Sequence, residues 1–260
     1  NAADIIVVGQ FVGHTALAAV GSTGSLINLL VNVFVGLSVG TNVLVARYYG
    51  ARDAKHLHET VHTSVLTSVL SGAALIVIGL ILAEPLLTLM GTPDDVLDQA
   101  TLYMRIYFVG MPASMLYNFG AAILRAVGDT KRPLYFLFIS GIVNVILNLV
   151  LVLVFHLGVA GVAIATVTSQ VISAVLVALC LIKTDAPYRL ELKKLRIHKS
   201  KLLEIIKIGL PAGMQGAVFS ISNVLIQSSI NSFGSTVMAG STAASNIENF
   251  VYTAMNALYQ

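Results

Sequence analysis

The stretch that decides the fold reads PLYFLFISGIVNVILNLVLVLVF and occupies residues 133–155. It contains no charged residue, and it lacks the strict alternation of apolar and polar positions that is typical of a membrane barrel strand. About 20 apolar residues carry a helix across the hydrocarbon core of a bilayer. Because the bilayer offers the backbone no hydrogen-bond partner, this run is predicted to form a membrane-spanning helix.

The rest of the chain has the same character. The sequence is 57% hydrophobic and 10% charged, with a mean hydropathy of +0.87, whereas soluble domains carry about a quarter charged residues. We therefore predict an all-α integral membrane protein, a polytopic helical bundle. Clusters such as Glu84-Pro85 and Gly128-Asp129 are predicted to lie in loops. The predicted segments are residues 1–13, 17–46, 60–83, 100–125, 133–155, 159–182, 203–232 and 236–260.

The basic residues indicate how the chain is oriented. Of the 15 Lys and Arg residues, all except Arg105 lie in or beside alternate connections, which follow the second, fourth and sixth segments. Basic loops stay on the cytoplasmic side of a membrane. We predict a multi-pass protein of the cell inner (plasma) membrane with cytoplasmic basic loops, which explains the positive charge without a nucleic-acid partner. No Walker motif, zinc-ligand spacing or nucleophile elbow is present, so neither an enzyme nor a cofactor is predicted.

An internal repeat predicts the domain organisation. A shift of 219 residues overlays Gly21-Ser22-Thr23 on Gly240-Ser241-Thr242, and this offset equals six spanning segments. Transporters are commonly built from such repeats, with the substrate path between them. We predict a six-helix N-lobe at 1–183, a basic cytoplasmic linker at 184–202, and the first two helices of a parallel-repeat C-lobe at 203–260. The whole protein is then expected to have about twelve helices, with the first and last segments truncated here, and to act as a monomer.

Polar residues inside spanning segments are candidates for function, because they are costly there. Asp4 is an acid in the first segment, Asn144 and Asn148 are four apart and share a helix face, and Thr166 lies in the sixth segment. One carboxylate, two amides and a hydroxyl form an oxygen-rich set that suits a hard cation such as Na⁺; the carboxylate also offers a place for H⁺. For the amides and the hydroxyl, plain interhelical hydrogen bonding is the alternative. The candidates for substrate contact are Gln170, Asn223 and Glu248.

Several motifs resemble the multidrug and toxic compound extrusion (MATE) family, in family order along nearly the whole chain. They are DIIVVG with ALAAVG in the first helix pair, GLSVGTNVLVARYYGA (36–51), LRAVGDTKRP (124–133), NVILN (144–148), GVAGVAIAT (158–166) and IGLPAG (208–213). The seventh segment has no acid, a pattern closer to the DinF-like branch of the family. The chain resembles the N-terminal two-thirds of such a transporter.

The resemblance implies a secondary-active antiporter with two lobes and alternating access. Such a protein exports small amphipathic or cationic organic compounds, drugs and toxins among them, in exchange for Na⁺ or H⁺. The family's first-lobe cation site maps onto Asp4, Asn144, Asn148 and Thr166 of this sequence. An alternative is a flippase for lipid-linked saccharides or lipids, an activity of related two-lobe proteins. That cargo favours a large basic cavity, and the spanning interiors contain almost no Arg or Lys.

Overall fold

The computed structural model describes the backbone of residues 2–259 and the side chains of 4–249, 251 and 255. Within this part of the chain there are nine α-helices and no strand. Five helices are long and apolar enough to cross a membrane, or six when the bent pair α4–α5 counts as one span. The helices are α1 (Ala2–Phe11), α2 (His14–Gly50), α3 (Ala54–Leu89), α4 (Asp94–Val109), α5 (Met111–Ala126), α6 (Lys131–Leu149), α7 (Gly158–Lys183), α8 (Lys199–Asn231) and α9 (Ser235–Tyr259), with short turns η1 (Val150–Val154) and η2 (Leu192–Lys194).

Each predicted segment corresponds to a helix or a helix pair, and the helix ends differ from the predicted ones by up to six residues. The fourth segment is bent by 50° between α4 and α5, where Gly110 precedes Pro112. The prediction that Glu84-Pro85 ends the third segment is wrong, because α3 continues through Pro85 to Leu89. Proline removes one intrahelical hydrogen bond and its ring crowds the carbonyl four residues earlier, but Pro85 lies only four residues before the end of α3. The chain turns only beyond Met90, where Gly91 adopts a positive φ of 68°.

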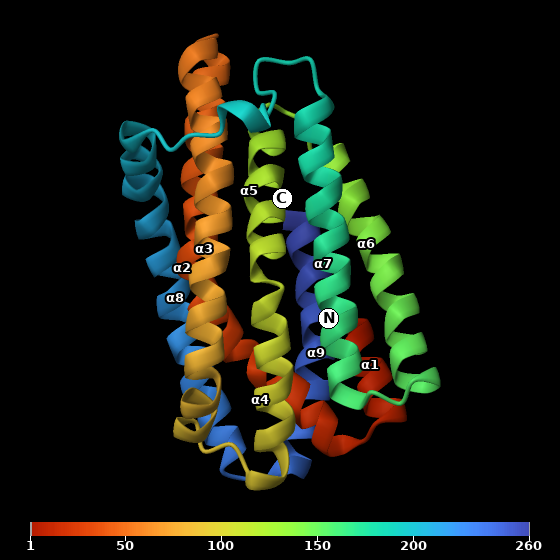
Figure 1. Ribbon diagram of the computed structural model, residues 1–260. Helices are drawn as coiled ribbons and strands as arrows, with labels where there is room; N and C mark the ends of the chain where they lie inside the picture. Colours follow the sequence, from red (N-terminus) through yellow and green to blue (C-terminus); the bar gives the residue numbers. More distant parts are fainter. Residues whose placement is uncertain (1, 260) are drawn as a thin grey trace.

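The bundle has a basic end and an opposite end (Figure 1). The turn between α2 and α3, the turn between α5 and α6, and the linker after α7 all lie at the upper end of Figure 1, and they carry the basic residues. The α3–α4, α6–α7 and α8–α9 connections lie at the lower end. The alternation read from the sequence therefore corresponds to two physical ends of the molecule. Which end faces the cytoplasm stays a prediction.

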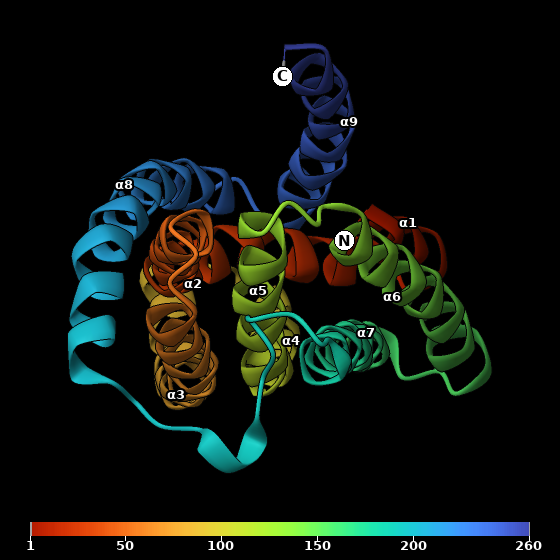
Figure 2. The same ribbon diagram turned by 90° about the horizontal axis from the view of Figure 1, so that it is seen from above.

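The core lies around the bent pair α4–α5, which stands in the middle of the bundle with α2, α3 and α7 around it (Figure 2). Its largest fully buried side chains include Met104, Phe108, Met111, Met115 and Phe119. By contrast, α6 lies at the periphery and exposes Leu134, Phe138 and Ile142 among other apolar side chains. An apolar outer surface is expected for a helix that faces lipid rather than water.

The linker between α7 and α8 is docked on the bundle and does not form an amphipathic helix. Its only regular structure is the single turn η2, and Tyr188 and Leu190 are buried against the basic ends of α3 and α7. His62 of α3 is buried as well, and its Nε2 accepts a hydrogen bond from the Glu191 N–H at 3.0 Å. The prediction of residues 184–202 as a linker is four residues too long, because α8 already begins at Lys199.

Helices α2 and α8 approach each other at backbone distance. Gly36 and Gly40 of α2 face Gly209 and Gly213 of α8, so each helix carries two glycines four residues apart on the contact face. A Cβ atom at Gly209 would lie 2.6 Å from the Leu37 Cα. This small-residue spacing is the common device by which membrane helices pack closely. The α2–α8 interface thereby holds the two helices at close backbone contact.

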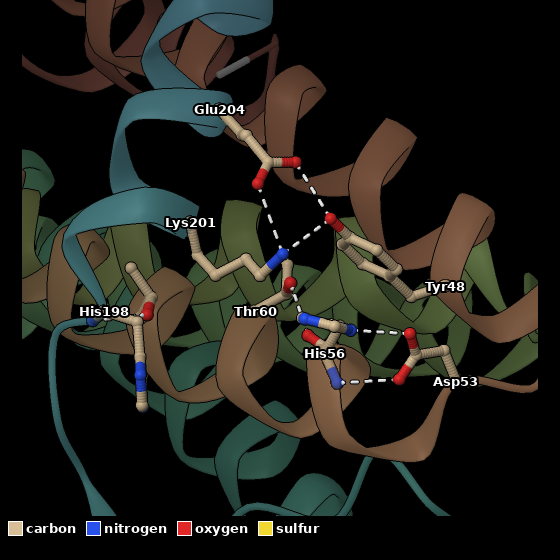
Figure 3. A network of polar contacts seen from close by, with 8 residues as sticks. Tyr48, Asp53, His56, Thr60, His198, Lys201 and Glu204 are labelled. Carbon is tan, nitrogen blue, oxygen red and sulfur yellow. Dashed lines mark hydrogen bonds and ion pairs between the residues drawn. The ribbon is translucent and has the colours of Figure 1, made fainter.

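A buried lysine lies between α2 and α8 at the basic end of their interface (Figure 3). Lys201 of α8 is 4% exposed, and its Nζ donates to the Tyr48 hydroxyl at 2.6 Å and to Glu204 Oε1 at 3.2 Å. The Tyr48 hydroxyl in turn donates to Glu204 Oε2 at 2.9 Å. The ammonium also lies 4.2 Å from the centroid of the Tyr48 ring, within the range of a cation–π contact.

Replacing Lys201 by methionine is expected to lower the free energy of unfolding by about 1–3 kcal/mol, the usual contribution of hydrogen bonds to a charged group. Methionine retains the length of the side chain but donates no hydrogen bond, so Tyr48 and Glu204 lose their common partner. The measurement is denaturation in mixed micelles. Lys199→Met is the matched control, because Lys199 is exposed; equal losses in both variants would contradict the role of the buried lysine.

Candidate functional site

The predicted intramembrane acid is fully buried. Asp4 lies in α1 and is 0% exposed. Its Oδ1 accepts a hydrogen bond from Asn148 Nδ2 at 2.5 Å, and its Oδ2 accepts one from the Thr166 hydroxyl at 3.3 Å. Helix α1 and the consecutive helices α6 and α7, which lie more than a hundred residues further along the chain, thus meet at one carboxylate. A buried charge is tolerated only with such polar partners.

The four residues predicted as a cation site form one hydrogen-bonded ring. Asn144 Nδ2 donates to Thr166 Oγ1 at 3.4 Å, and Asn148 Nδ2 donates its other hydrogen to Asn144 Oδ1 at 3.2 Å. Asn144 is 8% exposed, Asn148 0% and Thr166 5%. The four-residue spacing puts both amides on the face of α6 that meets α7. The next turn of α6 widens into the π turn η1, a feature frequent near functional sites.

The direction of these bonds defines the orientation of the amides. The Asn148 Nδ2 lies between two acceptors, the Asp4 carboxylate and Asn144 Oδ1, so an exchange of its N and O atoms would place oxygen against oxygen. This orientation leaves Asn148 Oδ1 buried without a hydrogen-bond partner among the described residues. An orphaned buried acceptor is costly. It is a ready ligand for a cation or for a water molecule.

The donor set fits a small monovalent cation better than a transition metal. All potential ligands are oxygens, namely one carboxylate, two amide oxygens and one hydroxyl, and hard cations prefer oxygen. In the described part of the chain, no group of three or more His, Cys, Asp or Glu side chains is suitable for a metal ion. The Asn148 Nδ2 occupies the position beside the carboxylate that a cation would take. Binding would therefore require this amide to turn its oxygen toward Asp4.

A cavity of about 770 Å³ lies beside Asp4, between α1, α2 and α4 on one side and α8 and α9 on the other. Its wall is rich in hydroxyls and amides. The only charged residues in the wall are Asp4 and Glu248, and neither Lys nor Arg lines it in the described region. The polar residues that line it include Thr23, Ser25, Asn28, Asn223, Gln227, Ser241, Thr242, Ser245, Asn246 and Asn249.

Two of the three predicted substrate contacts lie in this cavity. Asn223 of α8 and Glu248 of α9 line it, and both are exposed. Gln170 does not belong to the lining. Its Oε1 lies 2.8 Å from the position that a Cβ on Gly110 would take, and this oxygen is buried without a hydrogen-bond partner among the described residues. Gln170 therefore packs at the α4–α5 bend, outside the lining of the cavity.

Sequence reasoning missed the aromatic part of the wall. Tyr103 and Tyr107 of α4 line the cavity together with Asp4, and their rings stack at a centroid distance of 6.0 Å. The four-residue spacing of the two tyrosines was the available signal, because it puts both on one helix face. Asn28 and Gln227 were missed as well, and each is a polar residue in the middle of a spanning helix.

The repeated triplets meet in space at the end of the bundle opposite the basic loops. The Thr242 side chain of α9 lies directly against Gly21 of α2, in the space that a Cβ on Gly21 would occupy. Close by in the fold, Asn231 at the end of α8 donates from Nδ2 to the Met90 carbonyl at 3.2 Å. These contacts hold α8 and α9 against the first helices at this end of the cavity.

Comparison with known proteins agrees with the resemblance noted from the motifs. The MatE family model matches residues 1–150. A curated relative, the probable multidrug resistance protein YoeA of Bacillus subtilis (strain 168), is 32% identical over 95% of this chain and 55% of its own length. The chain thus spans about half the length of the curated relatives that it matches.

Solved structures show the same fold. An inward-facing conformation of a multidrug resistance MATE family transporter of the MOP superfamily matches with a TM-score of 0.86 and 27% identity, over 95% of this chain and 56% of that one. The MATE multidrug transporter DinF-BH, solved as a complex, matches with a TM-score of 0.89 over 96% of this chain and 56% of that one. At 22% identity this second likeness is one of fold.

Proposed function

Because the chain belongs to the MatE family, we propose that the whole protein exports amphipathic or cationic organic compounds in exchange for Na⁺ or H⁺. The observation that carries this proposal is a buried carboxylate, Asp4, at the wall of a polar cavity of about 770 Å³. Transporters of this kind work by alternating access of two lobes around a central site. The fold, with α8 and α9 packed across the first helices, supports that arrangement.

The coupling step is a change of charge at Asp4. Uptake of H⁺ or Na⁺ there removes a net negative charge from a site that is closed to solvent. The ring of Asp4, Asn148, Asn144 and Thr166 then has to rearrange, because the bonds that the carboxylate accepts weaken or give way to a cation. Since α1, α6 and α7 meet in this ring, its rearrangement changes how these helices pack. A local change of charge can bias a packing equilibrium in this way.

The charge of the cavity indicates the cargo. Two acids and no base line it in the described part, so its electrostatics favour a cationic or neutral compound over an anionic one. Tyr103 and Tyr107 add aromatic side chains to the lining, and aromatic rings attract cationic groups. A flippase for lipid-linked saccharides remains the alternative function. Its phosphate-bearing cargo calls for Arg or Lys, and the lining of this cavity does not favour it.

The test is the transport of a fluorescent organic cation across the membrane of proteoliposomes that contain the full-length protein. A pH gradient and a Na⁺ gradient are imposed separately, each with the other ion at equal concentration on both sides. We expect one of the two gradients to drive accumulation against the concentration gradient of the dye. Transport of an anionic lipid-linked saccharide without either gradient would contradict the proposal and support the flippase.

Replacing Asn148 by alanine is expected to raise the Na⁺ concentration that half-saturates transport by about tenfold or more, because one buried hydrogen-bonding ligand contributes roughly 1–3 kcal/mol. The measurement is Na⁺-dependent dye efflux at fixed pH. Asn118→Ala is the matched control, since among the described residues Asn118 bonds only the Ser114 carbonyl of its own helix through its side chain. An unchanged Na⁺ dependence in Asn148→Ala would place the cation elsewhere.

A further inference from the structure

A second cavity, of about 600 Å³, lies at the basic end of the molecule between α6 and α7. It is separate from the cavity beside Asp4, with which it shares no lining residue. Two cations line it, Arg132 at the start of α6 and Lys183 at the end of α7. We propose that this cavity binds the headgroup of an anionic phospholipid, with Arg132 and Lys183 as its phosphate ligands.

The guanidinium of Arg132 is held in place and still has donors to offer. Its Nε pairs with Asp129 Oδ2 at 3.2 Å, and its backbone N–H donates to Asp129 Oδ1 at 3.1 Å. One Nη1 hydrogen points to the Cys180 sulfur at 3.5 Å. A guanidinium has five N–H donors, and the described residues offer no acceptor to the other three. A guanidinium that is oriented by one acid and keeps unused N–H donors suits bidentate recognition of a phosphate.

The charge balance of the cavity favours an anion. Lys183 is exposed and forms no ion pair within the described part of the chain. The one acid of the lining, Asp185, is 99% exposed on its side chain and has Arg189 Nη1 at 3.8 Å, so water and a neighbouring cation compensate its charge. The remaining polar group of the lining is the Thr184 hydroxyl. When Asp129, the partner of Arg132, and Arg189, the partner of Asp185, are included, three cations stand against two carboxylates, and the unpaired charge is that of Lys183.

The apolar part of the lining indicates that the ligand is a lipid. Phe136 of α6 with Leu176 and Leu179 of α7 forms the wall on the membrane side of the two cations. Leu179 is 43% exposed, and the outward positions of both helices continue with exposed apolar residues such as Ile139 and Val175. A phosphate held between Arg132 and Lys183 would place its acyl chains along this surface. Basic pockets between membrane helices are known places for anionic headgroups.

Cys180 provides a direct readout, because it lines the cavity and is the single cysteine of this sequence. We would follow its alkylation by N-ethylmaleimide with peptide mass spectrometry, in full-length protein reconstituted in phosphatidylcholine vesicles with or without phosphatidylglycerol. We expect phosphatidylglycerol to slow the alkylation of Cys180 by about tenfold, since each cation near an anionic surface contributes favourably. In R132Q/K183Q the rate of Cys180 alkylation without phosphatidylglycerol, divided by the rate with it, should fall to near one.

Two controls separate the site from its alternatives. K131Q/K199Q removes the same number of charges from exposed lysines at the same end, outside the cavity, and should keep the full protection. Inorganic phosphate added to phosphatidylcholine vesicles tests a free anion as ligand. The proposal is overturned if phosphatidylglycerol gives no protection, if R132Q/K183Q stays protected, or if inorganic phosphate alone protects fully. Circular dichroism confirms that both double variants keep their helices.

Discussion

Replacing Asp4 by asparagine is expected to lower ion-driven export by roughly 5- to 150-fold, while the protein still folds and binds its cargo. The amide of asparagine has nearly the shape of the carboxylate, and its oxygen can accept the hydrogen bond that Asn148 Nδ2 now donates to Asp4. The Thr166 hydroxyl can rotate to accept from the new amide instead of donating. What is lost is the negative charge that H⁺ or Na⁺ neutralises, and with it the coupling between ion and cargo.

The expected size of this effect follows from ordinary coupling free energies. Sites that communicate through a conformational change are usually coupled by about 1–3 kcal/mol, which corresponds to roughly 5- to 150-fold in affinity. In Asp4→Asn, dye accumulation driven by the ion gradient should fall by roughly 5- to 150-fold. Equilibrium binding of the dye in detergent should change little. Both are measured with the same fluorescent cation.

Asp95→Asn serves as the matched control, because Asp95 is an exposed acid in the first turn of α4 and lies outside the cavity. It should transport like the unmodified protein. If Asp4→Asn continued to accumulate the dye, the coupling role would have to pass to Glu248, the other acid of the cavity wall.

Replacing Gly36 by alanine is expected to destabilise the protein by about 1–3 kcal/mol, the usual cost of forcing an extra group into a packed interior. A Cβ at this position would lie 2.6 Å from the Gly209 carbonyl oxygen and even closer to the backbone of Gly213. Because its neighbours are backbone atoms of α8, no side chain can move away to make room. The two helices must separate, and the Asn32–Ser220 hydrogen bond of 2.8 Å between them is then strained as well.

Gly24→Ala is the matched control for this variant. It makes the same change in the same helix, and a Cβ at Gly24 meets nothing within 4 Å. Alanine is favoured over glycine inside a helix by about 0.5–1 kcal/mol, so Gly24→Ala should be neutral or slightly stabilising. Denaturation in mixed micelles measures both variants. Equal stabilities would show that α2 and α8 tolerate separation, contrary to the close contact described above.

Much of the fold was predictable because membrane spans are a local property of the sequence. A run such as residues 133–155 has to form a helix wherever it lies in the bundle, since lipid satisfies no backbone group. The hydrogen-bonded ring of Asp4, Asn144, Asn148 and Thr166 was predictable in part for a similar reason. Asn144 and Asn148 share a helix face through their spacing alone, and Asp4 is conspicuous as an acid in an apolar helix.

The features that the sequence did not indicate concern contacts between distant segments. Gln170 has the same spacing from Thr166 as Asn148 has from Asn144, yet it lies against Gly110 at the α4–α5 bend and outside the cavity lining. Lys201 falls within the stretch predicted as a basic linker, but it is buried, and its ammonium is hydrogen-bonded to Tyr48 and Glu204. Such pairings depend on how whole helices pack, and no local pattern encodes them.

The sequence by itself determined the membrane class, the spanning segments, the separation of basic from acidic connections and the identity of the costly intramembrane acid. Each of these follows from the free energy of placing a residue in lipid or in water, which depends on that residue and its neighbours along the chain. Only the tertiary structure decided which helix faces meet, where the two cavities lie and which polar groups are paired. Those outcomes depend on packing between helices that are more than 200 residues apart in the chain, as in the contact between Gly21 and Thr242.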